Sequence, residues 1–137
     1  MRLFLFLCLL LASCNSKEDK EKYNRQLYRA VNNKDTAVLD IHINDKRFYG
    51  RYEISHYGTG KDSGDVRGDF RGDTLRGDFH YISFGGGWKR VPLALLKKDG
   101  KLYLGKGVIG TYFNLPCYVP EVPIEYKNPE FLFERIE

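Results

Sequence analysis

The chain has 137 residues and a formal net charge of +4, and at this length we expect one folded domain. Its 22 lysines and arginines do not form the clustered basic stripe that nucleic-acid binding requires, so no nucleic-acid partner is expected. The three cysteines are Cys8, Cys14 and Cys117. Removal of the leader described next and lipidation of Cys14 would leave Cys117 alone, which excludes an intramolecular disulfide.

The first predicted element is an export signal. Arg2 precedes an apolar run over residues 3–11, which is too short to cross a bilayer permanently, because that needs about 20 apolar residues. The tetrapeptide Leu11-Ala12-Ser13-Cys14 resembles the bacterial lipobox, in which Cys14 receives a diacylglycerol and the peptide is cut before it. The new amino terminus is then acylated, for example with palmitate. We therefore expect a signal peptide over residues 1–13 and a membrane anchor at Cys14; an ordinary secretory signal is the alternative.

A charged tether is expected behind the anchor, because residues 15–22 are polar and cannot bury a core. Asn15 is not the aspartate that retains lipoproteins in the inner membrane of enteric bacteria, which favours the outer membrane. The Lys17-Glu18-Asp19 cluster resembles a signal for display on the cell surface, and a periplasm-facing orientation is the alternative. Residues 22–34 carry apolar side chains at helical spacing and predict a short amphipathic helix, so the tether would extend over residues 14–35.

From residue 36 to residue 137 we expect a β domain, because the apolar period changes to two. If Ile43 faces Phe48 across a loop at 44–47, the register gives two sets of pairs. On one side are Ile41–Gly50, Leu39–Tyr52 and Ala37–Ile54, and on the other are Asp40–Arg51 and His42–Tyr49. Polar and apolar positions then separate cleanly, and a slip of one residue would destroy that separation.

A second hairpin is predicted around residues 71–74. Pairing Phe70 with Leu75 also sets the pairs Val66–Phe79, Gly68–Gly77, Asp69–Arg76 and Arg67–Asp78. The same residues spell Arg-Gly-Asp three times, at 67–69, 71–73 and 76–78. Facing glycines and paired charges explain the first and third copies, and a tight turn explains the second, so a structural role is favoured over integrin binding.

The remaining strands are expected at 74–84, 88–97, 102–104, 107–113 and 131–136, with a turn at 98–101 and a proline-rich loop or edge at 115–124. Short strands joined by short turns predict an all-β fold, an antiparallel meander that closes into a small barrel or a strongly bent sheet. Closure would remove the exposed edges that invite aggregation.

Several of these segments resemble a group of uncharacterised Bacteroidetes outer-membrane lipoproteins with a glycine-rich meander. They are residues 64–70, residues 72–79, Arg90 with the apolar run 91–96, and residues 100–107. The likeness covers about residues 48–110 and departs at the Ser83-Phe84-Gly85-Gly86-Gly87 loop. The resemblance implies a lipocalin-like barrel and no catalytic residues.

No motif in the chain specifies a reaction, a cofactor or a metal. The histidines His42, His56 and His80 form no ligand motif, and Cys117 is expected to be a buried small hydrophobe. We therefore expect a non-catalytic protein, with a hydrolytic enzyme as a minor alternative.

Two features suggest binding. The aromatic meander suggests a barrel that holds a small apolar or amphipathic ligand. The second feature is a candidate interaction surface for envelope protein or glycan, formed by Lys89, Arg90, Lys97, Lys98, Lys101 and Lys106. The alternative for these cations is intramolecular balance with the five glutamates of residues 111–137.

Overall fold

The computed structural model describes residues 21–137. The predicted signal peptide, the lipidation of Cys14 and most of the charged tether lie outside these residues. Ten strands follow one another along the described chain: β1 (Asn24–Asn32), β2 (Asp35–Ile43), β3 (Arg47–His56), β4 (Gly60–Arg71), β5 (Thr74–Ile82), β6 (Trp88–Lys98), β7 (Lys101–Leu104), β8 (Ile109–Tyr112), β9 (Leu115–Tyr118) and β10 (Leu132–Arg135).

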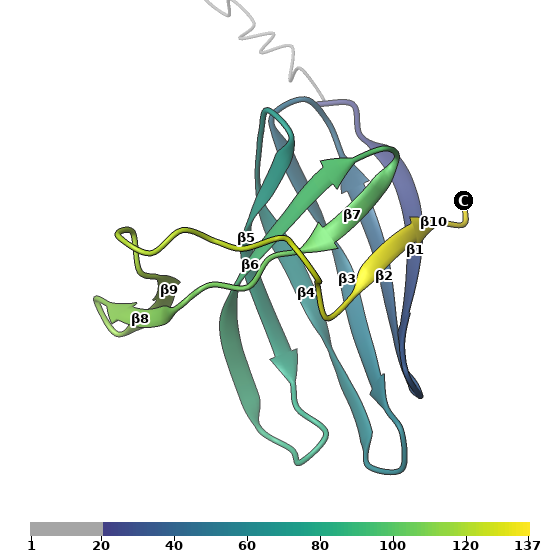
Figure 1. Ribbon diagram of the computed structural model, residues 1–137, viewed down its shortest axis with the longest axis vertical. Helices are drawn as coiled ribbons and strands as arrows, with labels where there is room; N and C mark the ends of the chain where they lie inside the picture. The colour runs from purple at the N-terminus through teal and green to yellow at the C-terminus, as the bar shows by residue number, and fades with distance from the viewer. Residues whose placement is uncertain (1–20) are drawn as a thin grey trace, which may run out of the picture.

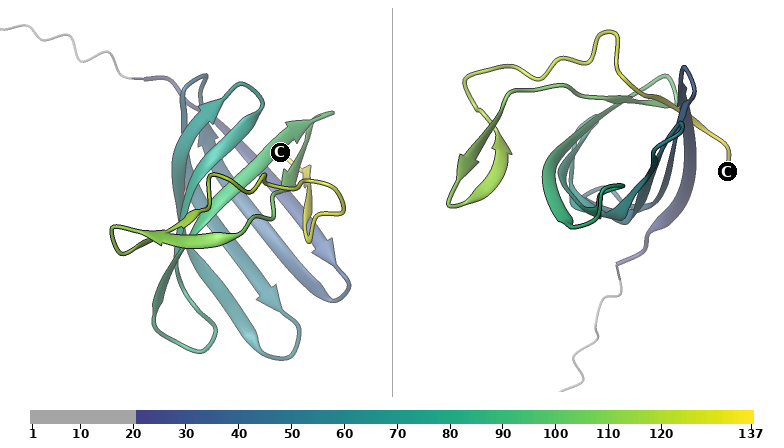
Figure 2. Two further views of the ribbon diagram at one scale, coloured as in Figure 1. Left: turned by 60° about the vertical axis from the view of Figure 1, so that its left-hand side comes forward. Right: turned by 90° about the horizontal axis from the view of Figure 1, so that it is seen from below.

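Eight of the strands form a closed antiparallel barrel, which confirms the predicted fold class (Figure 1). The order around the barrel is β1-β10-β7-β6-β5-β4-β3-β2, so the chain runs as a meander from β1 to β7. Strand β10 then enters between β7 and β1 and closes the ring. The other two strands, β8 and β9, pair only with each other and project from the barrel (Figure 2). Among the described residues, no helix is long and apolar enough to cross a bilayer.

Both predicted hairpin registers are confirmed. Strands β2 and β3 pair with Ile43 opposite Phe48 and Asp40 opposite Arg51. Strands β4 and β5 pair with Phe70 opposite Leu75, and Gly68 lies opposite Gly77. The hydrophobic period and the turn positions therefore set the register, because a slip of one residue would turn the apolar face toward solvent.

The helix predicted at residues 22–34 is wrong. This segment forms β1, which pairs with β2 along its whole length, so the barrel begins at Asn24 and not at residue 36. Alternate residues Gln26, Tyr28 and Ala30 are buried, which is the period of two of a strand. Other apolar residues of the segment happen to have helical spacing, and they led to the prediction of a helix. Pairing with β2 decides the conformation, because tertiary contacts override weak local preferences.

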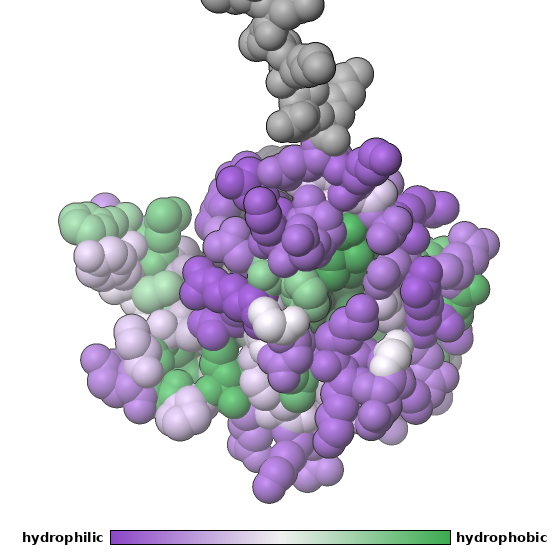
Figure 3. Space-filling view, turned by 90° about the horizontal axis from the view of Figure 1, so that it is seen from above, coloured by the Kyte–Doolittle hydropathy of each residue, from purple (hydrophilic) through white to green (hydrophobic). Residues whose placement is uncertain are grey.

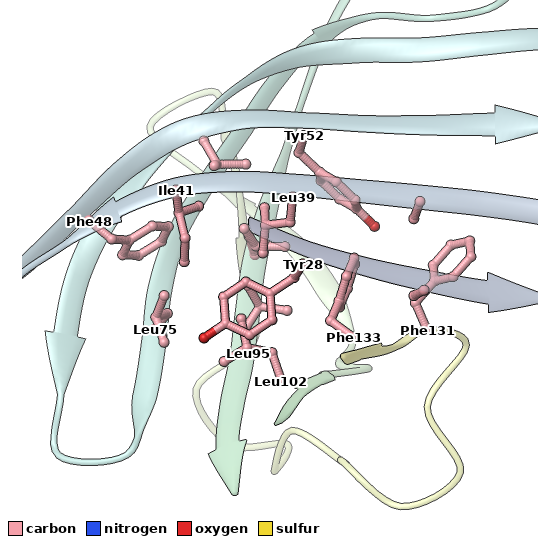
Figure 4. Packing of buried hydrophobic residues seen from close by; sticks show 14 of the residues in the cluster. Tyr28, Leu39, Ile41, Phe48, Tyr52, Leu75, Leu95, Leu102, Phe131 and Phe133 are labelled. Carbon is pink, nitrogen blue, oxygen red and sulfur yellow. The ribbon is translucent and has the colours of Figure 1, made fainter. Parts of the chain in front are cut away.

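The barrel interior is filled with side chains (Figure 4). The side chain of Tyr52 packs between Phe79, with ring centroids 4.6 Å apart, and Phe133, at 5.8 Å. Each large apolar side chain buried there contributes about 1.5–3 kcal/mol by leaving water. Buried core residues come from every barrel strand and from Phe131 just before β10: Tyr28, Ala30, Ala37, Leu39, Ile41, Ile43, Phe48, Tyr52, Val66, Leu75, Phe79, Leu93, Leu95, Leu102, Phe131 and Phe133.

Two facing glycines allow the sheet to bend sharply between β4 and β5. A Cβ atom on Gly68 would collide with the carbonyl oxygen of Arg76, and one on Gly77 would collide with that of Arg67. Strands that turn a barrel corner approach each other too closely for a side chain at such positions. Two of the three Arg-Gly-Asp triplets thus have glycines that the barrel itself requires.

Candidate functional site

A hollow on the outer wall lies between the barrel and the projecting hairpin. We call residues 107–120, which contain β8 and β9, the arm, and the hollow between them and β3–β6 the outer groove. The groove encloses about 660 Å³. Its lining residues are Tyr23, Arg47, Phe48, Tyr49, Arg67, Gly68, Asp69, Arg71, Arg76, Gly77, Asp78, Pro92, Pro116, Cys117 and Tyr118.

Arginines supply most of the charge in the groove. Alternate residues of β4 and β5 face outward, which brings Arg67 and Arg76 to the outer wall beside Asp78 and Asp69. The carboxylate of Asp78 lies 3.7 Å from Arg90 of β6, and that of Asp69 lies 3.4 Å from Arg71.

Three groove arginines have no carboxylate partner in the part of the chain that the structure describes. Within residues 21–137, no Asp or Glu oxygen lies within 4.0 Å of the guanidinium of Arg47, Arg67 or Arg76. The groove has four arginines and two aspartates among its lining residues, which gives it a formal charge of +2.

The predicted cross-strand ion pairs thus differ from the observed ones, although the register is right. Asp40 binds Arg25 of β1 at 2.9 Å, and Arg51 binds Asp65 of β4 at 2.9 Å, so the residues directly opposite each other, Asp40 and Arg51, bind in other directions. Each outer side chain has neighbours on two flanking strands, and a single hairpin register shows only one of them.

Aromatic side chains form the walls of the groove. On one side the ring of Tyr49 stacks on His42 at 4.9 Å and meets Tyr23 edge-on at 5.1 Å. On the other side Tyr118 of β9 lies beneath the Arg76 guanidinium, 5.5 Å from the ring centroid, within range of a cation–π contact.

A hydrogen bond attaches the arm to the barrel. The Tyr118 hydroxyl donates to the Pro92 carbonyl oxygen at 3.2 Å, and burial raises the pKa of Tyr118. The arm wall of the groove is therefore fixed to β6 by a group that stays protonated and able to donate.

Guanidinium groups beside aromatic faces suit one class of ligand. Planar guanidinium groups bind carboxylates and phosphates in two-pronged fashion, and aromatic rings offer flat apolar surface. A ligand that carries both an anionic group and an apolar face, such as an acidic saccharide, can use both.

The six cations predicted as one surface are divided. Lys89 and Arg90 lie at the start of β6, whereas Lys97, Lys98 and Lys101 surround the turn at its other end, about 30 Å away at 3.3 Å per residue. Lys106 follows β7 and forms a backbone bridge with Glu125.

Two of these cations have acidic partners within the chain. Arg90 approaches Asp78, and the Lys101 ammonium lies 3.1 Å from Glu134. For Lys101 the structure matches the alternative of internal charge balance. Lys98 instead lines a pocket of about 670 Å³ on the outer side of β6 and β7, together with Leu96, Tyr103 and residues 123–128.

The histidines lie apart from one another. On the outer wall His42 stacks on Tyr49, and His80 lies against Trp88 with the two rings tilted by 31°. His56 ends β3 and lies 2.8 Å from the Asp62 carboxylate. No cluster of three or more metal-ligating side chains occurs within the described part of the chain.

Cys117 is half-buried on β9 and lines the outer groove, so the prediction that it packs as a buried small hydrophobe is wrong. The arm carries Cys117 outside the barrel core.

A comparison with known protein families, with curated proteins and with solved structures found no match.

The sequence did not single out Arg47, Arg67 and Arg76. The hairpin register sets Arg67 and Arg76 opposite aspartates, which predicts ion pairs that the structure does not contain. The signal that could have identified them is the excess of arginine over aspartate on the outward positions of three adjacent strands.

Proposed function

We propose that this protein is a lipid-anchored interaction protein of the bacterial outer membrane, which binds an acidic glycan in the outer groove without catalysis. The main support for this proposal is that three arginines, Arg47, Arg67 and Arg76, face the groove without a carboxylate partner among the described residues. Charged groups without a partner at a surface gain most from a ligand of opposite charge.

The aromatic walls support the same ligand class. Tyr49 and Tyr118 both line the groove, so their side chains can contact the apolar faces of sugar rings. A carboxylate on the sugar would meet Arg67 or Arg76. By contrast, the barrel interior gives less support to a ligand held inside it, because buried side chains fill it.

Binding of an acidic oligosaccharide tests this proposal. The probe is trigalacturonate, and its fully methyl-esterified form, which has the same sugars without the charge, is the ligand control. We expect the Arg67→Ala/Arg76→Ala variant to bind trigalacturonate at least about tenfold more weakly, since each charge-assisted hydrogen bond contributes about 1.5–3 kcal/mol. Affinity should also fall as salt is added.

Arg51→Ala is the matched control variant. Arg51 lies on the same outer wall but is already bound to Asp65 and does not line the groove. It should leave binding unchanged. Equal binding of the esterified sugar, an equal loss in Arg51→Ala, or no binding of trigalacturonate at all would each overturn the proposal.

A small amphipathic ligand is a second candidate, supported by the pocket beside β6 and β7. Leu96, Tyr103 and Ile124 give it apolar walls, and Lys98 and Lys127 add cations for a carboxylate head. A fluorescent fatty acid should bind the wild-type protein there and should bind Tyr103→Asp more weakly. Tyr57→Asp, a change at an exposed tyrosine outside the pocket, should leave binding unchanged.

The anchor and its location need a separate test in the native cell. Labelled palmitate should enter the wild-type chain and not Cys14→Ala. External protease should then digest the lipidated protein on intact cells if it faces outward, whereas protection would place it toward the periplasm. Absence of label from the wild type would overturn the proposal of a lipid anchor.

A further inference from the structure

We propose that the tip of the arm, residues 111–115, inserts its side chains into the surface of the bilayer that holds the lipid anchor. This inference rests on the lipid anchor of the proposed function. It concerns a different part of the molecule from the glycan groove, because the tip extends beyond the groove wall (Figure 2).

Large apolar side chains are exposed at the tip. Phe113 is 81% exposed, Tyr112 is 67% exposed and Leu115 is 56% exposed, and Val108 and Ile109 nearer the base are about half exposed. The rings of Tyr112 and Phe113 pack edge-on with centroids 4.4 Å apart. Figure 3 shows apolar residues projecting on the arm side of a barrel surface that is otherwise mostly hydrophilic. A group of this kind marks an interaction site, since isolated exposed apolar residues are common but clusters are not.

The backbone at the tip holds Phe113 in a strained conformation. Phe113 and Asn114 form the turn between β8 and β9 with φ values of 47° and 60°. Glycine or asparagine is the usual residue in such a left-handed turn, and an aromatic residue is strained there. Strain at an exposed position, where no core packing compensates it, points to a functional role for the side chain.

The arm also lacks charge. From Gly107 to Pro120 the sequence contains no Asp, Glu, Lys or Arg, although such residues make up 29% of the chain. A protein partner that recognised the arm by charge would find nothing to pair with. A lipid surface needs only apolar and aromatic side chains, and Tyr and Phe suit the interface between headgroups and acyl chains.

Pairing of the strands limits how far the arm can enter. Strands β8 and β9 pair only with each other, so each has one edge without a neighbouring strand. Backbone groups on such edges lose water if they enter hydrocarbon. Insertion is therefore confined to the tip side chains at headgroup depth.

The anchor and the tip can reach one surface. In the view from below (Figure 2, right), the arm tip and the purple start of β1 lie toward the same side of the barrel, and the turn between β1 and β2 lies on the opposite side. Residues 14 to 21 span at most about 24 Å when extended, so lipidated Cys14 would keep the barrel near the bilayer. The arm then provides a second contact that orients the barrel.

Fluorescence quenching by brominated lipids tests the insertion. The chain has one tryptophan, Trp88, so Trp88→Phe with Phe113→Trp gives a single probe at the tip. The full lipidated chain, purified from bacterial membranes, is reconstituted into phosphatidylethanolamine and phosphatidylglycerol vesicles brominated near the headgroup. We expect emission from position 113 to fall about twofold or more relative to unbrominated vesicles, because the probe lies at the interface.

Trp88→Phe with Val31→Trp is the matched control. Val31 is 53% exposed and pairs with Thr36 beside the turn between β1 and β2. That turn lies on the side away from the arm tip (Figure 2, right), so emission from a tryptophan at position 31 should not change. Tyr112→Trp provides a second tip position if Phe113→Trp folds poorly.

The outcomes separate the arm from the anchor. A chain that fails to float with the vesicles would overturn the lipid anchor. A chain that floats but shows no quenching at positions 113 and 112, or equal quenching at position 31, would overturn the insertion. Protection of the tip by a protein in cells, without quenching in vesicles, would assign the tip to a protein partner and also overturn it.

Discussion

The barrel buries its large apolar side chains, whereas the arm exposes them. Phe133 on β10 is 0% exposed, whereas Phe113 at the arm tip is 81% exposed. Both lie in short antiparallel strands or their turns, so local structure does not explain the difference. The barrel closes on itself and hides one face of every strand, but two strands alone have no face that they can bury.

This contrast separates residues that make the fold from residues available for function. Substitutions inside the barrel should cost stability, and substitutions on the arm should cost little. Variants of the two regions, compared by their unfolding, test that division.

The largest difference is expected between two single variants, Phe133→Ala in the barrel and Phe113→Ala in the arm. Phe133→Ala should lower the free energy of unfolding by about 3–5 kcal/mol, because it leaves a cavity beside Tyr52 and Phe131. Phe113→Ala should change it by less than about 0.5 kcal/mol, since the side chain is exposed. Urea unfolding of both variants measures the difference. Similar losses would show that the arm packs against the barrel more than its exposure indicates.

The barrel corner gives the next test. Gly68→Ala should destabilise by about 3 kcal/mol, because the added methyl group meets the Arg76 carbonyl and the strands must separate. Gly72→Ala, in the middle Arg-Gly-Asp triplet, has no atom within 4 Å of the added Cβ and should cost about 1–2 kcal/mol from its φ of 67° alone. Equal losses in urea unfolding would remove the structural explanation for the repeated triplets.

A gain of stability is expected from Tyr52→Phe. The Tyr52 hydroxyl is buried and has no hydrogen-bond partner among the described residues, so its removal should stabilise the barrel by about 1 kcal/mol.

The same variant should alter the response to alkali. Burial raises the pKa of Tyr52 above its ordinary value of 10.0, so the unfolded chain loses this proton first and stability falls as the pH rises past 10. Tyr52→Phe should reduce that fall in thermal melts. A loss of stability at neutral pH would instead indicate a partner for the hydroxyl, such as a buried water.

The smallest effect is expected on the outer wall. A hydrogen bond from Arg25 lowers the pKa of Asp40 below 3.8, so this pair stabilises the fold above that pH and is lost as the pH falls through the lowered pKa. Asp40→Asn should cost less than about 1 kcal/mol at pH 7 and less still in acid or high salt, because the pair is partly exposed. An NMR titration of Asp40 at or above pH 3.8 would contradict the proposed pairing.

The sequence was sufficient for those parts of the fold in which one strand determines the next. The turns at 44–47 and 71–74 and the period of two around them fixed both registers. It failed at β1, because Leu27 and Val31 matched a helical spacing and only pairing with β2 selects the strand.

The candidate site was harder to predict, since it depends on neighbours that are distant in the sequence. Asp78 approaches Arg90 of β6 instead of Arg67 directly opposite, and this leaves Arg67 for the groove. The arm contributes Tyr118 from outside the barrel order. Neither the approach of Asp78 to Arg90 nor the position of Tyr118 can be predicted from the register of a single hairpin.

The short strand β10 makes closure of the barrel the last step of pairing. It pairs with only two residues of β1 and two of β7, yet its pairing with β1 connects residues about a hundred positions apart in the sequence. Strands β1 to β7 can pair one after another during folding, but the ring cannot close until β10 joins β7 and β1. Until then β1 and β7 expose open edges, so this interval is when the protein is most vulnerable to aggregation.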